Sequence, residues 1–341
     1  MRALTLGACV RLLLLAVLVN LSACSKALEL EAAEPLAKAA RSVLERMPGY
    51  SPGPYETVLL EDLTLRGADD RADMDLRVWY PRRDDPAPVV IFSHGNWSDK
   101  DRYDAVIKHW ASYGFVVIAT THLDGVNMAR GIFNALRYGN DGLIGGRVAD
   151  IRYLIDHLAR VQALLPVSID PERLAVSGHS FGAFTAQQFA GARAITEDGE
   201  IGAKDSRVDA VVALSPPGPM FDEITAQSWT KMQGPVLMTT GTHDVNPQFF
   251  PDWRLHKMSF DTAPTGEQYA VVVAGADHYL GNLICRPERE GPPQRDALNI
   301  VNAISTVFLL AHLNGDAVMA QWLASADVAN MSGGFAELAK K

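Results

Sequence analysis

The sequence predicts an α/β fold in which a mostly parallel, eight-stranded sheet is covered by helices on both faces. Short apolar runs of the buried-strand type alternate with helical segments, and this alternation indicates a parallel sheet with helical crossovers. The composition agrees, because 48% of the 341 residues are hydrophobic and 21% are charged, as in a globular protein with a substantial core. Nothing marks a linker within residues 51–320, so we expect one domain there.

The first 23 residues are typical of an export signal. Arg2 and Arg11 place positive charge beside an apolar run over residues 12–23. A membrane-spanning helix needs about 20 apolar residues, so the shorter run favours a cleaved signal peptide. The run ends in LSAC at Cys24, which resembles the lipobox of bacterial lipoproteins, where the cysteine becomes the lipid-modified first residue.

This resemblance implies an exported protein that is anchored to a bacterial membrane by acyl chains on Cys24. Ser25 follows the cysteine instead of an aspartate, which in that family favours the outer membrane, facing the periplasm or the cell surface. An ordinary cleaved signal peptide is the alternative, because an A-x-A-like site is also near. With Cys9 removed and Cys24 lipidated, Cys285 remains alone as a half-buried spectator, and no internal disulfide can form.

Residues 24–50 are expected to form a tether and an N-terminal helix, which begins near Pro35 and stops at Pro48 and Gly49. Two strands within residues 55–80 follow, as an antiparallel pair. Six more strands are predicted from apolar runs at residues 87–95, 115–122, 172–178, 209–217, 235–244 and 268–278.

Helical segments separate these strands. The first helix is expected over residues 98–114, with Ser98 or Asp99 as its cap. A loop rich in glycine and asparagine leads to a second helix at Arg147. The remaining helices are predicted at residues 147–165, 181–191 and 296–313, with a helical tail over 321–341.

The stretch VSGHSFGAFTA places Ser180 in a G-x-S-x-G motif between a predicted strand and a predicted helix. Gly178 and Gly182 flank it, and side chains at these positions would collide in so tight a turn. A helix that begins at the serine adds its amide dipoles to the site. The alternative is a serine that only closes a bend, but this strand–turn–helix context predicts a nucleophile presented on a sharp turn.

A serine hydroxyl is a weak nucleophile at neutral pH, so it needs a basic histidine that a carboxylate orients. Asp244 and His278 end the last two predicted strands, at the sheet edge where Ser180 lies, in the order serine, acid, histidine. Asp277 is a rival acid, but an adjacent residue seldom reaches Nδ1 of its neighbouring histidine. His256 follows no strand, so no catalytic role is expected for it.

A tetrahedral intermediate needs two backbone donors. We expect one from the amide of Phe181, immediately after the nucleophile. The second is assigned to the amide of Asn96 in the SHGNW stretch, with Trp97 as the second choice. The alternative is that HGN is only a turn after a strand.

Two segments are expected to roof the site, SPPGPMFDEITAQSW and HYLGNLICR. With Trp97, they offer Met220, Phe221, Trp229 and Tyr279 as apolar walls, which predicts short or compact acyl groups. The alternative is that these side chains belong to the core.

The stretches FSHGNW, YDAVIKHWASYGFVVIATTH and VSGHSFGAFTA resemble the α/β-hydrolase superfamily, and closer still its platelet-activating-factor acetylhydrolase and dienelactone-hydrolase-like branch. The resemblance covers roughly Tyr55 to Leu313 and implies a catalytic domain that hydrolyses carboxylic esters through an acyl-enzyme. The acetylhydrolases take their acid after the sixth strand, where this chain has Ser215, followed by Asp222 and Glu223. This departure disfavours a phospholipid substrate.

Other classes of function find less support. The net charge of −9 argues against a nucleic-acid partner. No metal-ligand spacing such as H-E-x-x-H or C-x-x-C and no phosphate-binding glycine loop occurs, so we expect neither a metal nor a cofactor. We expect a monomeric esterase that acts on small-molecule or lipid esters. A lipase or polyester hydrolase with a wider cleft, or a non-catalytic surface-anchored binding protein, are the alternatives, and a peptidase is disfavoured.

Overall fold

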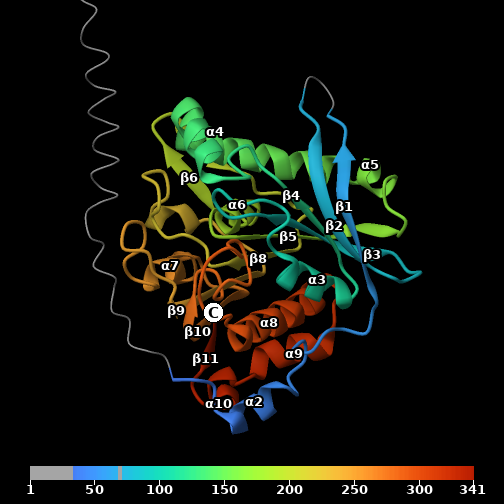
Figure 1. Cartoon of the computed structure of the whole chain (residues 1–341), viewed down its shortest axis with the longest axis vertical. Coiled ribbons are helices and arrows are strands. Elements are labelled where there is room, and N and C mark those ends of the chain that lie inside the picture. The colour runs from blue at the N-terminus through green and yellow to red at the C-terminus, as the bar shows by residue number, and fades with distance from the viewer. Residues whose placement is uncertain (1–33, 68–70) are drawn as a thin grey trace, which may run out of the picture. The chain divides into compact units, whose positions relative to one another are not determined.

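The computed structural model describes residues 34–67 and 71–341. A nine-stranded sheet forms its centre, in the order β1-β2-β4-β3-β5-β8-β9-β10-β11 (Figure 1). Neighbours are parallel from β4 through β10 and antiparallel at both edges. The strands are β1 (Thr57–Leu65), β2 (Met74–Pro81), β3 (Ala87–Ser93), β4 (Val116–Thr120), β5 (Ile169–His179), β8 (Ala210–Leu214), β9 (Val236–His243), β10 (Gln268–Asp277) and β11 (Ala336–Lys340). The fold is therefore of the α/β-hydrolase type.

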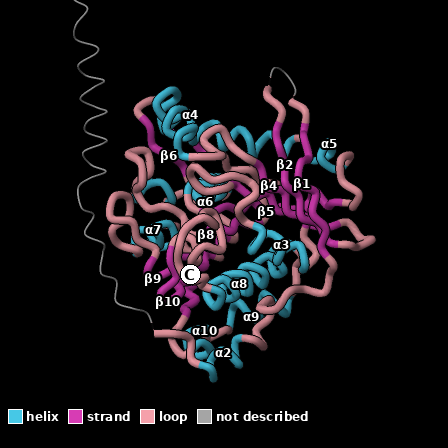
Figure 2. Tube along the Cα trace, viewed as in Figure 1, coloured by secondary structure: helices cyan, strands magenta, loops and turns pink. Residues whose placement is uncertain are grey.

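Helices cover both faces of the sheet (Figure 2). They are α2 (Lys38–Leu44), α3 (Asp104–Ser112), α4 (Met128–Asp156), α5 (Leu158–Gln162), α6 (Phe181–Phe189), α7 (Arg254–Thr262), α8 (Arg295–Leu313), α9 (Ala317–Ser325) and α10 (Val328–Ser332), with a 3₁₀ turn η1 (Ala226–Trp229). Successive strand residues point to opposite faces, so each strand feeds two cores. In β3, Val89 and Ile91 join the core under α4 and α6, whereas Val90 and Phe92 join the core under α3 and α8.

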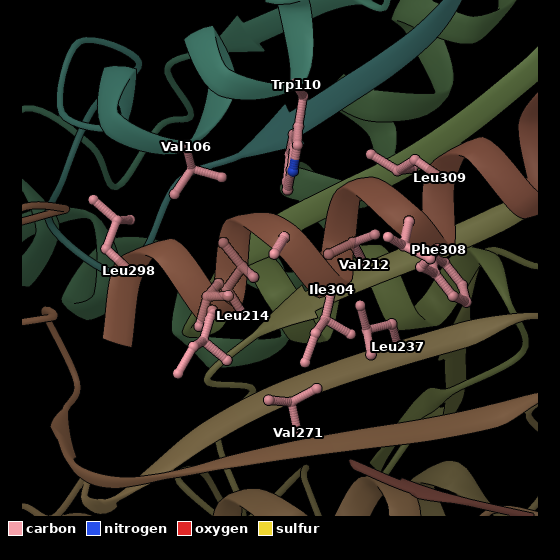
Figure 3. Close-up of a cluster of buried hydrophobic side chains, with 14 of the residues drawn as sticks. Val106, Trp110, Val212, Leu214, Leu237, Val271, Leu298, Ile304, Phe308 and Leu309 are labelled. Carbon is pink, nitrogen blue, oxygen red and sulfur yellow. The ribbon is translucent and has the colours of Figure 1, made fainter. Parts of the chain in front are cut away.

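The second of these cores is closed by α8. Figure 3 shows Trp110 of α3 and Ile304 of α8 packed against sheet residues such as Val212 and Leu237. Among the described residues, α8 is the one helix long and apolar enough to cross a membrane, but 78% of its apolar window is buried inside the molecule. Its apolar composition is therefore accounted for by the core that it fills.

Two helix predictions need correction. The helix after β3 begins at Asp104, with Tyr103 at its cap position and no side-chain hydrogen bond that caps it, so Ser98 and Asp99 precede the helix instead of capping it. The glycine- and asparagine-rich stretch before Arg147 is helical, because α4 begins at Met128. Gly139, with φ 72°, bends α4 into two segments, and this bend accommodates the glycines that argued for a loop.

The predicted helical tail over residues 321–341 is also wrong in its last part. After α9 and α10, residues 336–340 form β11, which pairs antiparallel with β10 from Tyr269↔Lys340 to Val273↔Ala336. The unpaired edge of β10 supplies the hydrogen-bonding groups that make a strand favourable there. This ninth strand and a separate hairpin of β6 (Arg193–Thr196) and β7 (Gly199–Gly202) were not predicted.

The antiparallel pairing predicted for the first two strands is confirmed, since Thr57 of β1 lies opposite Pro81 of β2. Cys285 is buried with 3% exposure and is therefore not half-exposed as expected. The predicted signal peptide and the lipidation of Cys24 lie outside the described residues.

Candidate active site

Ser180 occupies a strained turn between β5 and α6. Its backbone has φ 54° and ψ −123°, a region that non-glycine residues seldom adopt and that costs free energy. A Cβ atom on Gly178 would lie 2.3 Å from the carbonyl oxygen of Gly182, and one on Gly182 would lie 2.0 Å from that of Ser93. Both glycines are therefore required sterically, as the sequence predicted. The Ser180 amide donates to the Leu214 carbonyl at 2.9 Å, which ties the turn to β8.

The structure brings Ser180, His278 and Asp244 into one hydrogen-bonded chain. His278 Nε2 lies 2.9 Å from Ser180 Oγ, and His278 Nδ1 lies 2.7 Å from Asp244 Oδ1. Because a carboxylate only accepts hydrogen bonds, Nδ1 carries the proton, and Nε2 is left to accept from the serine hydroxyl. Asp244 is fully buried, whereas Ser180 and His278 are 6% and 7% exposed. The serine and the histidine can therefore be reached from outside, and the carboxylate cannot.

Asp244 is held from three directions. Thr240 Oγ1 donates to its Oδ2 at 2.9 Å, and His256 Nε2 lies 2.9 Å from the Oδ1 that His278 also contacts. Burial raises the pKa of Asp244, but the imidazoles of His256 and His278 outweigh burial and hold this pKa well below its usual range. The carboxylate is therefore ionised although it is surrounded by protein.

His256 is the residue that the sequence reasoning missed. It comes from α7, and its Nδ1 donates to the Pro216 carbonyl at 2.8 Å while its Nε2 faces Asp244. Both ring nitrogens face acceptors, which favours a doubly protonated imidazolium. Burial lowers the pKa of His256, but the Asp244 carboxylate and the Pro216 carbonyl more than offset this and raise it. Nε2 is not aligned for a hydrogen bond, so the contact with Asp244 is best described as an ion pair.

The two residues whose amides are predicted as oxyanion donors are placed near Ser180 in different ways: Phe181 follows it in the chain, and Asn96 lines the same cavity. Phe181 opens α6, and Asn96 lies in the turn that follows β3. Within the part of the chain that the structure describes, neither amide donates to another protein group. The guanidinium of Arg286, which lines the same cavity, donates to the carbonyls of Asn96 and Trp97, each at 3.0 Å, and so fixes this turn.

A buried ion pair holds the same turn from its inner side. Arg147 donates through Nη1 to the His94 carbonyl at 2.6 Å and through Nε and Nη2 to Asp124 at 2.9 and 2.7 Å. Burial raises the pKa of Asp124, yet Arg147 brings it down to about 2. His94 donates through Nδ1 to the Gly95 carbonyl and accepts the His122 amide at Nε2, so its ring is neutral. Burial and the charge of Arg147 place the pKa of His94 well below its usual value.

A small cavity opens onto the serine. Its volume is about 130 Å³. The structure places the predicted wall residues Trp97, Met220, Phe221 and Tyr279 on this cavity, together with Asn96, Ser180 and His278. The loop after Asp244 adds three further wall residues, Asn246, Phe249 and Phe250. A larger cavity of about 560 Å³ lies at the opposite edge of the sheet, beside the amino ends of β5 and β8, and contains none of these side chains.

Trp229 does not line the cavity, so this prediction was wrong. Its ring is fully buried, its Nε1 donates to Gln187 Oε1 at 2.8 Å, and it meets the ring of Phe184 edge-on at 6.1 Å. An indole that packs onto α6 and satisfies its N–H there is a core residue.

The other acids that were considered have different partners. Asp277 Oδ1 accepts the amides of Tyr279 and Gly281 and so shapes the loop after β10. Glu223 Oε2 accepts from Asn140 Nδ2 at 3.3 Å, and Asp222 is exposed. Asp244 therefore occupies the position beside His278 Nδ1.

Among the described residues, Asp244, His256 and His278 form the one group whose metal-ligating atoms lie within 4.8 Å of one another. Each of these atoms already faces a partner within the group or the Ser180 hydroxyl. This arrangement suits the holding and movement of a proton, and it offers no ligand atom that is free for a cation.

Comparison with known proteins finds a similarity to a family model over part of the chain. Residues 50–216 match the family model described as chlorophyllase, whereas no curated protein matches the chain. The matched range includes the turn after β3 and Ser180, and it ends before Asp244 and His278. The match agrees with the resemblance to α/β-hydrolases and gives no support for the acetylhydrolase or dienelactone-hydrolase branch in particular. The fold and the match together indicate an ester hydrolase of the α/β-hydrolase type.

Proposed function

We propose that this protein is a serine carboxylesterase in which Ser180 is the nucleophile, His278 the general base and Asp244 the orienting carboxylate. The observation that carries the proposal is the unbroken chain from Ser180 Oγ through His278 to Asp244, with contacts of 2.9 and 2.7 Å, at the base of a cavity. The strained backbone of Ser180 supports it, because such strain is concentrated at functional sites.

In the first half of the reaction, Ser180 Oγ attacks the ester carbonyl carbon while His278 Nε2 takes the hydroxyl proton. The amides of Phe181 and Asn96 stabilise the oxyanion that develops on the carbonyl oxygen. As the tetrahedral intermediate collapses, the carbon–oxygen bond to the alcohol breaks. His278 then gives its proton to the departing alkoxide, and an acyl group remains on Ser180.

In the second half, His278 takes a proton from water as the water oxygen attacks the acyl carbon. The second intermediate expels Ser180 Oγ, which is reprotonated by His278, and the carboxylic acid leaves. Each half requires an imidazolium at His278 for a moment. The ionised Asp244 stabilises that cation, and we assign His256 the role of a positioning residue that keeps Asp244 ionised and in place.

The walls of the site favour short or compact acyl groups. A volume of about 130 Å³ is small beside the roughly 300–1,000 Å³ of ordinary ligand pockets. The aromatic rings of Phe221 and Phe250 and the thioether of Met220 make these walls largely apolar, although the polar side chains of Asn246 and Arg286 also line the cavity. The family name does not by itself define the substrate, because one fold hosts many activities.

The test is the hydrolysis of p-nitrophenyl acetate by Ser180→Ala. We expect turnover to fall by about 10⁴-fold or more, as when the nucleophile of such a triad is lost. Ser177→Ala is the matched control, because Ser177 lies in β5, the strand that leads to Ser180, and its hydroxyl donates to the Val212 carbonyl. This control should retain turnover close to that of the wild type. Nearly full turnover in Ser180→Ala would contradict the proposal.

A further inference from the structure

The first part of α4 and the loop before it expose an unusual number of large apolar side chains. Of the ten such side chains that are exposed among the described residues, seven lie within residues 123–138. Leu136 is 83% exposed and Phe133 is 60% exposed. We call this the α4 apolar surface; its members are Leu123, Val126, Met128, Ile132, Phe133, Leu136 and Tyr138. Contiguous exposed apolar side chains of this kind mark interaction sites.

In this helical segment small and polar residues face the protein, whereas large apolar residues face solvent. Its inward positions are the small Gly131 and the polar Asn134, whose Nδ2 donates to the Leu123 carbonyl at 2.8 Å. Ile132, Phe133 and Leu136 point to solvent instead, although burying each would favour folding. Packing among the described residues therefore does not account for these apolar side chains, and we attribute them to a contact outside this part of the chain.

The charge of the same surface identifies that contact. Arg130 and Arg137 are exposed and lie seven residues apart, so two helical turns bring them to the same side, beside the apolar stripe. Neither guanidinium pairs with a carboxylate in the part of the chain that the structure describes. The one acid within residues 123–138, Asp124, is buried against Arg147. In a chain of net charge −9, this surface is apolar and cationic, as in helices that lie on anionic membranes.

The α4 apolar surface also borders the candidate active site. Gly131 packs so closely on Trp97 that a Cβ atom there would lie 1.9 Å from the indole Cδ1, and Trp97 lines the cavity at Ser180. At the far end of the segment, beyond the bend at Gly139, Asn140 contacts Glu223, close in sequence to the wall residue Phe221.

We propose that residues 123–138 dock this protein onto an anionic phospholipid bilayer. Ile132, Phe133 and Leu136 enter the boundary between headgroups and acyl chains, while Arg130 and Arg137 contact the lipid phosphates. The bilayer then lies next to the mouth of the cavity. Delivery of membrane-dissolved esters to Ser180 is a consequence that rests on the proposed function, whereas docking itself does not.

Binding is measured with the full chain and vesicles of phosphatidylcholine, with or without phosphatidylglycerol. The pair Phe133→Asp with Leu136→Asp should lower the partition coefficient by about tenfold or more. The pair Arg130→Gln with Arg137→Gln should lower it by about tenfold on the phosphatidylglycerol vesicles alone. Val318→Asp is the matched control, because Val318 is 70% exposed on α9, outside this surface, and it should bind like the wild type.

A local probe separates this surface from any other membrane-binding segment. A nitroxide on Leu136→Cys should become accessible to oxygen dissolved in the bilayer, whereas one on Val318→Cys should stay in water. The signal from labelled wild type is subtracted in both cases. Absence of vesicle binding, or binding that leaves the label at position 136 in water, would overturn the proposal. Self-association that buries this label without vesicles would assign the surface to a second copy of the chain.

The same variants distinguish this proposal from the proposed function. Hydrolysis of soluble p-nitrophenyl acetate should be unchanged in the Phe133 and Leu136 pair, because neither side chain lines the cavity. Unchanged hydrolysis with unchanged vesicle binding would reject the docking surface alone. Vesicle binding in a chain that hydrolyses no ester would reject the esterase alone.

Discussion

Two buried polar clusters lie at the same edge of the sheet, and they differ in the pKa of their histidines. The pKa values of His94 and His122 are lowered in one cluster, and that of His256 is raised in the other. The Asp244 cluster contains Ser180, His278 and His256 around an ionised aspartate. The Asp124 cluster contains Arg147, His94 and His122 around another ionised aspartate. Both aspartates are fully buried.

The difference is the arginine. In the Asp124 cluster, Arg147 neutralises the carboxylate, and burial together with this fixed positive charge lowers the pKa of His94 and His122. In the Asp244 cluster the carboxylate contacts two imidazoles and the Thr240 hydroxyl, with no arginine beside it, and it raises the pKa of His256 in spite of burial. Burial disfavours charge on all three histidines; the positive charge of Arg147 adds to this effect at His94 and His122, whereas the carboxylate of Asp244 outweighs it at His256.

This contrast fits the task proposed for each cluster. A turn that presents oxyanion donors must stay in place, and a neutral His94, bonded to backbone groups and beside Arg147, can hold it without gaining or losing protons. A general base must become an imidazolium and then lose the proton. Asp244 can stabilise that transient cation because no arginine has already neutralised it.

The largest change should come from removing the charge of Asp244. We expect Asp244→Asn to lower the turnover of p-nitrophenyl acetate by about 10⁴-fold with the fold retained, because the amide no longer orients and stabilises the imidazole of His278. Asp222→Asn is the matched control, since Asp222 is exposed and in a different loop. A tolerated Asp244→Asn beside a crippling Asp222→Asn would show that the acid follows the sixth strand, as in the acetylhydrolases.

Removing the cation from the other cluster should act on stability. Arg147→Met leaves Asp124 charged, buried and unpaired, and the expected loss is about 3–5 kcal/mol of unfolding free energy. Urea denaturation measures it. Arg152→Met, which changes an exposed arginine on the same helix, should stay within about 0.5 kcal/mol of the wild type. Equal stability of the two variants would mean that Arg147 does not neutralise Asp124.

The stability of the fold should also depend on pH. His94, His122 and His179 are buried with lowered pKa values, chiefly because burial disfavours their charged form. Below about pH 6.5 the unfolded chain binds more protons at these histidines than the folded chain does. The unfolding free energy should therefore fall as the pH is lowered, by up to about 1.4 kcal/mol per pH unit for each histidine. Urea midpoints from about pH 5 to about pH 8 measure this dependence.

His256 contributes with the opposite sign. Its raised pKa stabilises the fold fully below its unfolded value, and that contribution is lost as pH rises through its folded value. His256→Gln should therefore remove only the decline on the alkaline side of the profile. A urea midpoint that stays constant below about pH 6.5 would show that the three buried histidines titrate alike in both states.

The sequence predicts those parts of the molecule that depend on local pattern. Ser180, Asp244 and His278 follow apolar strands whose carboxyl ends meet at one edge, so strand order alone brings them near one another. His256 depends on how α7 packs against the loop before it, and a residue that follows no strand gives no local signal for such a contact.

Two other differences have the same cause. The sequence alone cannot tell whether Trp229 lines the cavity or lies in the core, because its burial depends on contacts with Gln187 and Phe184 of α6. The first part of α4 carries glycines and an apolar face without a core to fill. This pattern is typical of a loop. The structure shows a helix instead, because the non-helical backbone of Gly139 allows α4 to bend there and continue.

The most direct test of the central claim, that His278 activates Ser180 for attack, is to find the atom that a fluorophosphonate modifies. The serine oxygen should displace fluoride from phosphorus, and mass spectrometry of the digested protein should place the adduct on the peptide that contains Ser180. Ser180→Ala should remain unlabelled, and Ser177→Ala should label like the wild type. An adduct on another residue, or ester hydrolysis that continues with Ser180 unmodified, would contradict the account.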